Sequence, residues 1–429
     1  MFKDKKKPCF LLAVAGTLLL GCDALTDVAA PDVVQPQDVD NAEGAASFGA
    51  AALNNLYSQF SGMTSTTGRF SDEFYLSDSF NAFAAVDYRE QAVTYTEWGP
   101  VLLGRGRTFA QLGIDLYLQH APDERAAIGQ LYAVRGLAAL LLGEVNCNGT
   151  PLSEVVDLKP VYGGPITSDS MTTRAVAELD AALEYAAADE RIMSLVGVAR
   201  GRALTNLGRF SEAASAVAGV PTDYVYHAEL SAAGAGLQNP IFNTNSMTDV
   251  WGAITVADGE GNNGLDFVSA NDPRVPTELL GTGRDGETEH YYYKKFTDRY
   301  DPIVLASGIE ARLIEAEADL KAGGGRWLSI LNDLRAVAID PPLEPLMDPG
   351  SPDARVDLVF RERAFWLFAT GHRMGDLRRL LRQYGRSQND THPVGHYKGP
   401  QSYGTDVVFI LTLSEQSNPE GFVCMDRNP

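Results

Sequence analysis

Two histidines stand at a spacing that can bind a metal ion. His392 and His396 are four residues apart, and two imidazoles at this spacing on a helix can hold one metal ion. Pro393 and Gly395 lie between them and disfavour a helix. The two side chains are therefore not expected to share a face, and we expect no metal site there.

A second group of oxygen-bearing side chains loosely follows the spacing of a calcium-binding loop. These residues are Asp258, Glu260, Asn262 and Asp266. The position that needs glycine is Asn263 and the closing glutamate is replaced by Ser269. The sequence therefore favours a solvated loop and no cofactor, with a structural Ca²⁺ site as the less favoured alternative.

Catalytic chemistry has little support in the sequence. With 56 aspartates and glutamates among 429 residues, paired carboxylates carry almost no information. No serine lies in a nucleophile-elbow pattern. We therefore expect no catalytic residues and no enzymatic activity.

Aromatic residues in loop-like segments fit ligand capture better, because sugar rings and peptide side chains stack on flat aromatic faces. Four residues are the candidates for ligand binding: Trp98, Tyr224, Tyr226 and Trp251. Phe74 and Tyr75 are weaker candidates, and residues 291–293 alternate as a half-buried strand would. The alternative for each is that the aromatic ring fills an interface between loops and helices.

The N-terminal residues are typical of a lipoprotein signal. Four lysines lie in the first seven residues, and a short apolar run at residues 9–20 follows them. This run is too short to span a bilayer. Gly21 and Cys22 then complete a lipobox. We expect a signal peptide at residues 1–21, lipidation of Cys22, membrane attachment through that anchor, and an acidic, proline-containing tether at residues 22–44.

The charge of the chain narrows its partners. The formal net charge is −21, and a protein this acidic repels nucleic acid and anionic membrane surfaces. Cys9 leaves with the signal peptide, so Cys147 and Cys424 remain as thiols. In an exported protein they are expected to form one disulfide, and the alternative is two unpaired or buried thiols.

Most of the chain has the apolar periodicity of packed helices. Amphipathic segments occur at residues 45–61, 104–120, 124–145 and 172–187. Residues 196–221 and 310–335 follow the spacing of tetratricopeptide repeats, which predicts an α-solenoid with minor β structure. Residues 45–429 are expected to form a single helical domain, with a loop-rich insertion at about residues 221–300 that faces the ligand.

The most informative segment is residues 361–380, RERAFWLFATGHRMGDLRRL. An apolar stripe predicts a helix that ends at Gly371, followed by a short arginine-rich helix. The charged residues are expected to pair with Glu362 or to cap helix ends, and so to have a structural role. The segment's characteristic residues are Arg361, Glu362, Gly371, Arg373, Asp376 and Arg378.

This segment resembles the C-terminal signature of the SusD/RagB family of nutrient-uptake outer-membrane lipoproteins. Further similar motifs are SDEF at residue 71, CNGTPLS at 147, ANDPRV at 270, KKF at 294, IEARLIEAEADL at 309 and LNDLR at 331. The tail at residues 403–418 is also similar, although Ile410-Leu411-Thr412 replaces the family's usual proline-containing segment, and Asn418-Pro419 fits its final Asn-Pro.

The resemblance implies a function at the cell surface. Such a protein captures an oligosaccharide, or less favourably a peptide, and acts as the lid of a TonB-dependent barrel transporter in the outer membrane. Asp23, next to the lipidation site, is compatible with surface export in this family but with inner-membrane retention in many proteobacteria. The alternatives are a tetratricopeptide scaffold lipoprotein for envelope assembly and an envelope glycan hydrolase.

Overall fold

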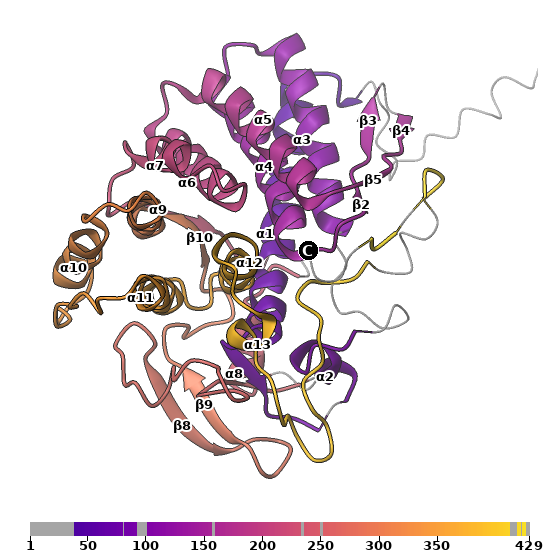
Figure 1. The fold of residues 1–429 in the computed structure, drawn as a ribbon. Coiled ribbons are helices and arrows are strands. Elements are labelled where there is room, and N and C mark those ends of the chain that lie inside the picture. Colours follow the sequence, from indigo (N-terminus) through magenta and orange to yellow (C-terminus); the bar gives the residue numbers. More distant parts are fainter. Residues whose placement is uncertain are drawn as a thin grey trace, which may run out of the picture.

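The computed structural model describes residues 38–79, 81–91, 101–156, 159–232, 236–248, 252–411, 418–421 and 423–425. These residues are mainly helical, as Figure 1 shows. The helices are α1 (Ala42–Phe70), α2 (Asn81–Asp87), α3 (Val101–His120), α4 (Arg125–Val145), α5 (Ser168–Ala186), α6 (Glu190–Asn206), α7 (Phe210–Val217), α8 (Pro240–Asn245), α9 (Gly308–Lys321), α10 (Trp327–Val337), α11 (Pro352–Trp366), α12 (Arg373–Tyr384) and α13 (Gln388–Thr391).

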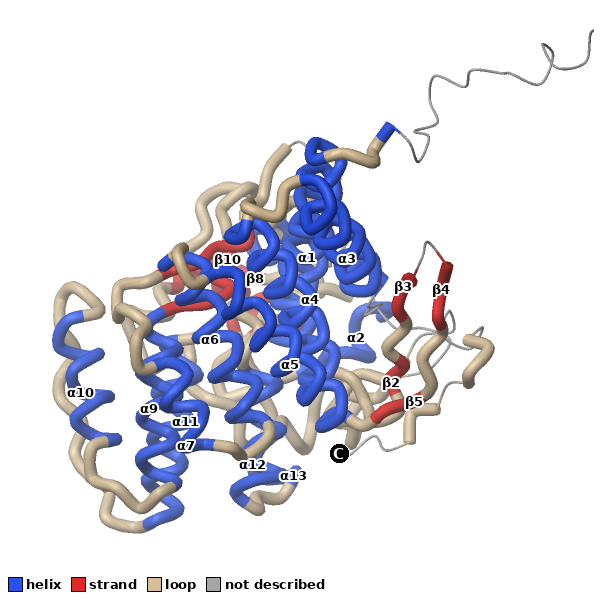
Figure 2. Tube along the Cα trace, turned by 90° about the horizontal axis from the view of Figure 1, so that it is seen from above, coloured by secondary structure: helices blue, strands red, loops and turns tan. Residues whose placement is uncertain are grey.

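The strands are short and pair only in twos within the described residues. They are β1 (Phe74–Leu76), β2 (Thr150–Pro151), β3 (Glu154–Val156), β4 (Lys159–Val161), β5 (Pro165–Ile166), β6 (Val225–Ala228), β7 (Ile254–Val256), β8 (Thr277–Thr282), β9 (Glu289–Tyr293) and β10 (Ile303–Ser307). The antiparallel pairs are β1–β7, β2–β5, β3–β4, β6–β10 and β8–β9. The β3–β4 pair projects from the helical part (Figure 2).

The predicted mainly helical fold with minor β structure is confirmed. Consecutive helices such as α4 and α5, α6 and α7, and α9 and α10 pack against each other. The tetratricopeptide solenoid inferred from the repeat spacing stays a prediction.

Close packing of α4 on α5 depends on glycine. A Cβ atom at Gly136 would lie 2.7 Å from Cγ of Leu179, and one at Gly129 would lie 2.9 Å from the backbone nitrogen of Ala186. These glycines are seven residues apart, so they lie on one face of the helix.

Two helix ends differ from the predictions. The first helix continues to Phe70 instead of ending near residue 61. The helix expected at residues 172–187 begins at Ser168, because Thr167 is its N-cap and accepts a hydrogen bond from the backbone of Ser170. Local periodicity identifies helices better than it identifies their ends.

Residues 221–300, predicted as a loop-rich insertion, contain a short helix and short strands between longer irregular stretches. They include β6, α8, β7, β8 and β9. Asn239 caps α8 by accepting the backbone N–H of Phe242, and Pro240 occupies the first turn. The KKF motif at residue 294 lies in a turn directly after β9.

Among the described helices, α4 is the one long and apolar enough to cross a membrane by length and composition. Of its most apolar stretch, 78% is buried inside the protein. A buried core helix meets the same two criteria, and α4 packs against α3 and α5.

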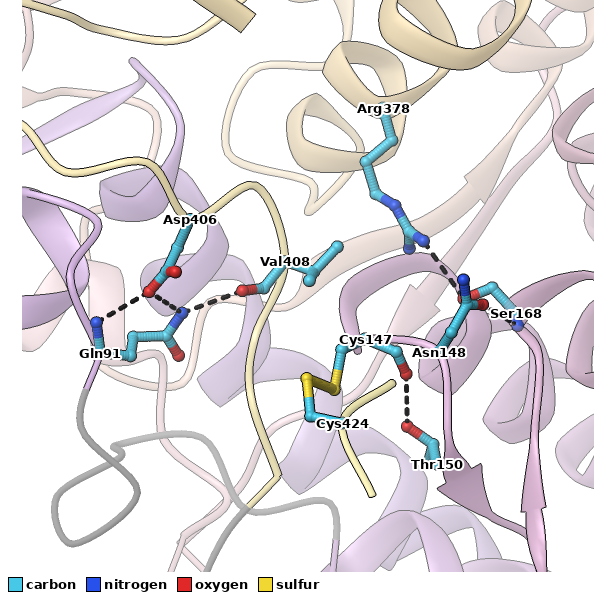
Figure 3. Close-up of a disulfide and its surroundings, with 9 residues drawn as sticks. All are labelled: Gln91, Cys147, Asn148, Thr150, Ser168, Arg378, Asp406, Val408 and Cys424. Atoms are coloured by element: carbon cyan, nitrogen blue, oxygen red, sulfur yellow. Dashed lines mark hydrogen bonds between the residues drawn. A yellow bond between two sulfur atoms is a disulfide. The ribbon is translucent and has the colours of Figure 1, made fainter. Parts of the chain in front are cut away.

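The C-terminal segment crosses back over the helices and is held at several points (Figure 3). Cys147 and Cys424 form a disulfide, with their Cα atoms 5.6 Å apart. Earlier in the C-terminal segment, Asp406 and Val408 are held by Gln91. The backbone N–H of Gln91 donates to the Asp406 carboxylate, and its side chain donates to the carbonyl of Val408. The structure thus contains the disulfide that the sequence favoured, and it joins the tail to the end of α4.

Candidate functional site

The family-like segment forms a buried cluster of charges, here called the ion-pair network. Arg363 donates from Nε and Nη2 to the two carboxylate oxygens of Asp376, both at 2.9 Å. Arg379 donates to Glu317 at 3.1 and 2.9 Å and also to Asp376 at 2.9 Å. All four side chains are at most 5% exposed. Two guanidinium groups therefore share two carboxylates between α9, α11 and α12.

The charges in this network stabilise one another. Burial alone would raise the pKa of Asp376, but the guanidinium groups of Arg363 and Arg379 hold that pKa well below its ordinary value. The carboxylate is therefore ionised at any pH at which the protein functions. This cluster fixes the packing of three helices, and both oxygens of each carboxylate accept hydrogen bonds from guanidinium groups.

The remaining signature residues also have structural partners. Arg373 donates to Asp72 at 2.6 and 2.8 Å, and Arg378 donates to the carbonyls of Gly143 and Glu144 at the end of α4. Arg378 thus satisfies carbonyls that a helix end leaves unpaired. Arg361 pairs with Asp266 at the surface.

Two details of this segment were predicted incorrectly. The helix ends at Trp366, five residues before Gly371, although Gly371 does adopt a left-handed conformation with φ of +73°. Glu362 pairs with Arg274 and Arg335, not with the charges that follow the break. The turn between α11 and α12 orients α12 so that its charged side chains pair with residues of other helices.

A second feature is a pocket of about 400 Å³, here called the tyrosine pocket. Its walls combine tyrosine rings with carboxyl groups. The residues that line it are Tyr75, Thr255, Val256, Ala257, Asp258, Glu260, Gly261, Thr288, Glu289, Tyr291, His396, Tyr397 and Tyr403.

Four separate parts of the chain position this pocket. Tyr75 on β1 lies opposite Thr255 on β7 in the antiparallel register. The backbone of Tyr291 on β9 donates to the Thr255 hydroxyl at 2.7 Å, which holds β9 beside β7. The C-terminal segment closes the pocket, where the backbone N–H of Tyr403 donates to the carbonyl of Gly395.

The tyrosines of the pocket contact one another. The ring centroids of Tyr75 and Tyr397 are 5.2 Å apart, and those of Tyr397 and Tyr403 are 5.4 Å apart. The Tyr75 hydroxyl also donates to the carbonyl of Tyr397 at 3.1 Å. These contacts hold the rings in place, so the aromatic wall is formed before any ligand arrives.

One carboxyl group in the pocket is incompletely paired. Glu260 is 7% exposed, and its Oε1 accepts the Tyr403 hydroxyl at 2.6 Å. Its Oε2 has no hydrogen-bond partner among the described residues. Burial raises the pKa of Glu260 well above its ordinary value, against the lowering effect of the Tyr403 hydrogen bond. The pocket therefore offers a buried polar atom that a ligand can satisfy.

Of the sequence candidates for ligand binding, the weaker candidate Tyr75 lines the tyrosine pocket, and two of the four leading ones can be placed in the structure. Trp98, Trp251 and the lipidation site Cys22 fall outside the described residues. Tyr224 is half-buried and its hydroxyl donates to the carbonyl of Arg191. Tyr226 is 1% exposed and its hydroxyl contacts that of Tyr57 at 2.9 Å, so its ring belongs to the core and offers no face to a ligand. Neither lines the tyrosine pocket.

The suspected metal ligands also have other partners. His392 is fully buried beside Thr391, whereas His396 is exposed at the tyrosine pocket. Asp258 accepts the backbone N–H of Ser269. Among the described residues, no group of three or more His, Cys, Asp or Glu side chains can hold a metal ion.

No protein-family model matches the sequence, and no curated protein matches it either. Solved structures do resemble it. Surface glycan-binding protein A from Bacteroides uniformis has a TM-score of 0.65 at 16% identity and covers 88% of this chain and 98% of its own. A SusD superfamily protein from Parabacteroides distasonis has a TM-score of 0.65 at 14% identity, with the same coverage of 88% and 98%.

A third similar structure contains a bound glycan. It is surface glycan-binding protein A from Bacteroides thetaiotaomicron in complex with laminarihexaose, with a TM-score of 0.59 at 14% identity, covering 86% of this chain and 95% of its own. The likeness extends over nearly the whole length of each protein. The chain therefore has the fold of the SusD-like surface glycan-binding proteins.

Proposed function

We propose that this protein captures oligosaccharides at the cell surface and binds them in the tyrosine pocket without covalent chemistry. The observation that carries the proposal is the pocket itself. It combines four tyrosines with polar side chains that can accept or donate hydrogen bonds to sugar hydroxyls. The fold shared with a glycan complex supports an oligosaccharide ligand over a peptide.

Delivery of the glycan to a TonB-dependent barrel transporter is the second part of the proposal. It is supported by the resemblance of the signature segment and by the lipobox at Cys22. In this proposal residues 1–21 are removed, residues 22–44 tether the protein to the outer membrane, and residues 45–429 form one domain. The helical pairs, as a tetratricopeptide-like solenoid, contact the barrel.

Two neighbouring tyrosines give a matched test of the binding site. Tyr291 lines the tyrosine pocket, whereas Tyr292 on the same strand does not, because successive strand residues point to opposite faces. We expect Tyr291→Ala to weaken oligosaccharide binding about tenfold, and Tyr292→Ala to leave it unchanged. Calorimetric titration of the full chain with oligosaccharides identified on a glycan array measures both.

Equal losses in the two variants, or none in either, would place binding elsewhere. The transporter is tested separately by pull-down of the lipidated protein from its native membranes in mild detergent. Recovery of a stoichiometric β-barrel partner supports the lid role. Recovery of envelope assembly factors would favour the scaffold alternative, which no feature of the tyrosine pocket requires.

A further inference from the structure

The titratable carboxyl groups in the walls of the tyrosine pocket outnumber its basic groups. Asp258, Glu260 and Glu289 line it, and no lysine or arginine is among the described residues that do so. The exposed His396 is the one basic side chain in that lining. Because the whole chain is also strongly acidic, at −21, a ligand that enters the pocket meets a negative potential.

Glu260 and carboxyl groups outside the lining also act on the aromatic wall. Burial raises the pKa of Tyr75, and the carboxyl groups of Glu260, Asp87, Asp285 and Glu287 raise it further. A negative field that opposes ionisation of a phenol equally opposes an anionic ligand beside that phenol. The same field favours a cation.

The protein itself places an ammonium group against this wall. Nζ of Lys398 lies 4.5 Å from the centroid of the Tyr75 ring and 2.7 Å from a carboxylate oxygen of Asp285. This arrangement combines a cation–π contact with an ion pair. The pocket offers the same two elements to a ligand, since tyrosine rings and carboxyl groups both line it.

Two acidic side chains can contact such a ligand, but in different ways: Glu260 is a buried acid whose pKa is raised, and Glu289 is an exposed carboxylate. Oε2 of Glu260 has no partner among the described residues. Glu289 is exposed and accepts the Tyr291 hydroxyl at 2.8 Å, so its carboxylate is held next to an aromatic face. Asp258 differs, because one of its oxygens already accepts the backbone N–H groups of Val268 and Ser269.

We infer that the tyrosine pocket selects glycans by charge, so that it binds amine-bearing sugars in preference to sugars that carry carboxylates. The inference rests on the glycan-binding role proposed above. An ammonium group in the pocket contacts tyrosine faces and the carboxylate of Glu289, whereas a uronate brings a like charge to the same carboxylate. The cation is organic, because no metal-binding group of side chains exists among the described residues.

The test compares three probes on the full chain by calorimetric titration. They are oligomers of glucosamine, of N-acetylglucosamine and of galacturonic acid, of equal length, at about pH 6 where an amino sugar is largely protonated. We expect the glucosamine oligomer to bind about tenfold more tightly than the neutral oligomer, and the galacturonate oligomer to bind most weakly. Raising the salt concentration to about 0.5 M should narrow these differences.

A matched pair of substitutions assigns the selectivity to the pocket. Glu289→Gln keeps an acceptor for Tyr291 but removes the charge, and it should lower the ratio of amine to neutral affinity several-fold. Glu278→Gln removes a charge from the neighbouring strand of the same hairpin, outside the pocket and near Lys294. This control should keep the wild-type ratio.

The possible results separate the inference from the proposed function. Equal affinity for the three probes, or tighter binding of the galacturonate, overturns charge selection and leaves glycan binding intact. An unchanged ratio in Glu289→Gln also overturns it. If none of the probes binds and the glycan array detects no ligand, the proposed function fails and the inference fails with it.

Discussion

The ion-pair network and the tyrosine pocket both contain buried carboxyl groups, but the two regions satisfy them differently. In the network, Asp376 and Glu317 each accept hydrogen bonds from guanidinium groups through both carboxylate oxygens. In the pocket, Glu260 has one phenol partner, and its second oxygen has none among the described residues. The first arrangement suits a scaffold and the second suits a site that a ligand completes.

The pKa values follow the same division. Guanidinium neighbours outweigh burial at Asp376 and hold its pKa low, while burial dominates at Glu260 and raises its pKa. A charge with a fixed partner resists change in pH, and an unpaired acid is sensitive to what binds beside it. Local partners, more than burial itself, thus separate the carboxylate of the network from the buried acid of the pocket.

The largest effect is expected when the network loses one member. Asp376→Ala leaves Arg363 and Arg379 buried with Glu317 as their shared carboxylate, and this should lower the free energy of unfolding by about 3–5 kcal/mol. Chemical denaturation measures the loss. The control is Asp348→Asn, whose exposed pair with Arg355 has little to contribute.

A loss in Asp376→Ala no greater than that in Asp348→Asn would contradict the structural role of the network. The comparison is informative because both aspartates accept two hydrogen bonds from one arginine. They differ in burial, so the difference between the two variants reports the cost of removing a buried carboxylate from two guanidinium groups, compared with an exposed one.

A buried acid between the two regions should respond to pH. Burial raises the pKa of Glu73 to about 8, against the lowering effect of the Ala369 N–H that donates to its Oε1 at 3.0 Å. Since the folded pKa is above the unfolded one, the protonated form favours folding, and stability is lost as pH rises through this interval. Glu73→Gln keeps the acceptor and removes the titration.

This variant should therefore gain about 3 kcal/mol relative to wild type between pH 5 and pH 8, and the gain should grow nearly evenly over this interval. Unfolding free energies at several pH values measure it. A constant difference across the pH range would show that Glu73 is ionised in the folded protein and has a partner.

The sequence predicted the parts of this molecule that depend on neighbours along the chain. Apolar periodicity identified α4 and α9, and the density of arginine in residues 361–380 indicated structural charge. It did not reveal which partners the charges meet, because Arg373 pairs with Asp72, 301 residues away. A salt bridge of that separation has no local pattern.

The tyrosine pocket was mostly missed for the same reason. Its tyrosines come from three distant segments, and the chain contains 17 tyrosines. Tyr75 was a weaker candidate and Tyr397 and Tyr403 were not proposed. Tyr226 had been favoured because its segment resembles a loop, but β6 pairs with β10 and turns its ring into the core. Loop-like composition alone cannot distinguish an exposed aromatic ring from a buried one.

The smallest effect on stability is expected at the ion pair between Lys398 and Asp285, beside the tyrosine pocket. Lys398→Met breaks the contact with Asp285, whose side chain is 5% exposed, and should cost about 1 kcal/mol. Burial alone would raise the pKa of Asp285, but Lys398 and Thr288 lower it to about 2. Because the folded pKa is below the unfolded one, this contribution is present near neutral pH and is lost as pH falls toward 2.

In Lys398→Met, the fall in the free energy of unfolding as the pH is lowered should be smaller than in wild type. Unfolding measurements between about pH 5 and pH 2 can detect this difference. The same change removes a positive charge next to Tyr75, so amine-bearing glycans should bind more tightly if the pocket selects by charge. A loss of several kcal/mol would instead make Lys398 as structural as the ion-pair network. Tyr75, which Lys398 contacts, would then have a mainly structural role although it lines the pocket.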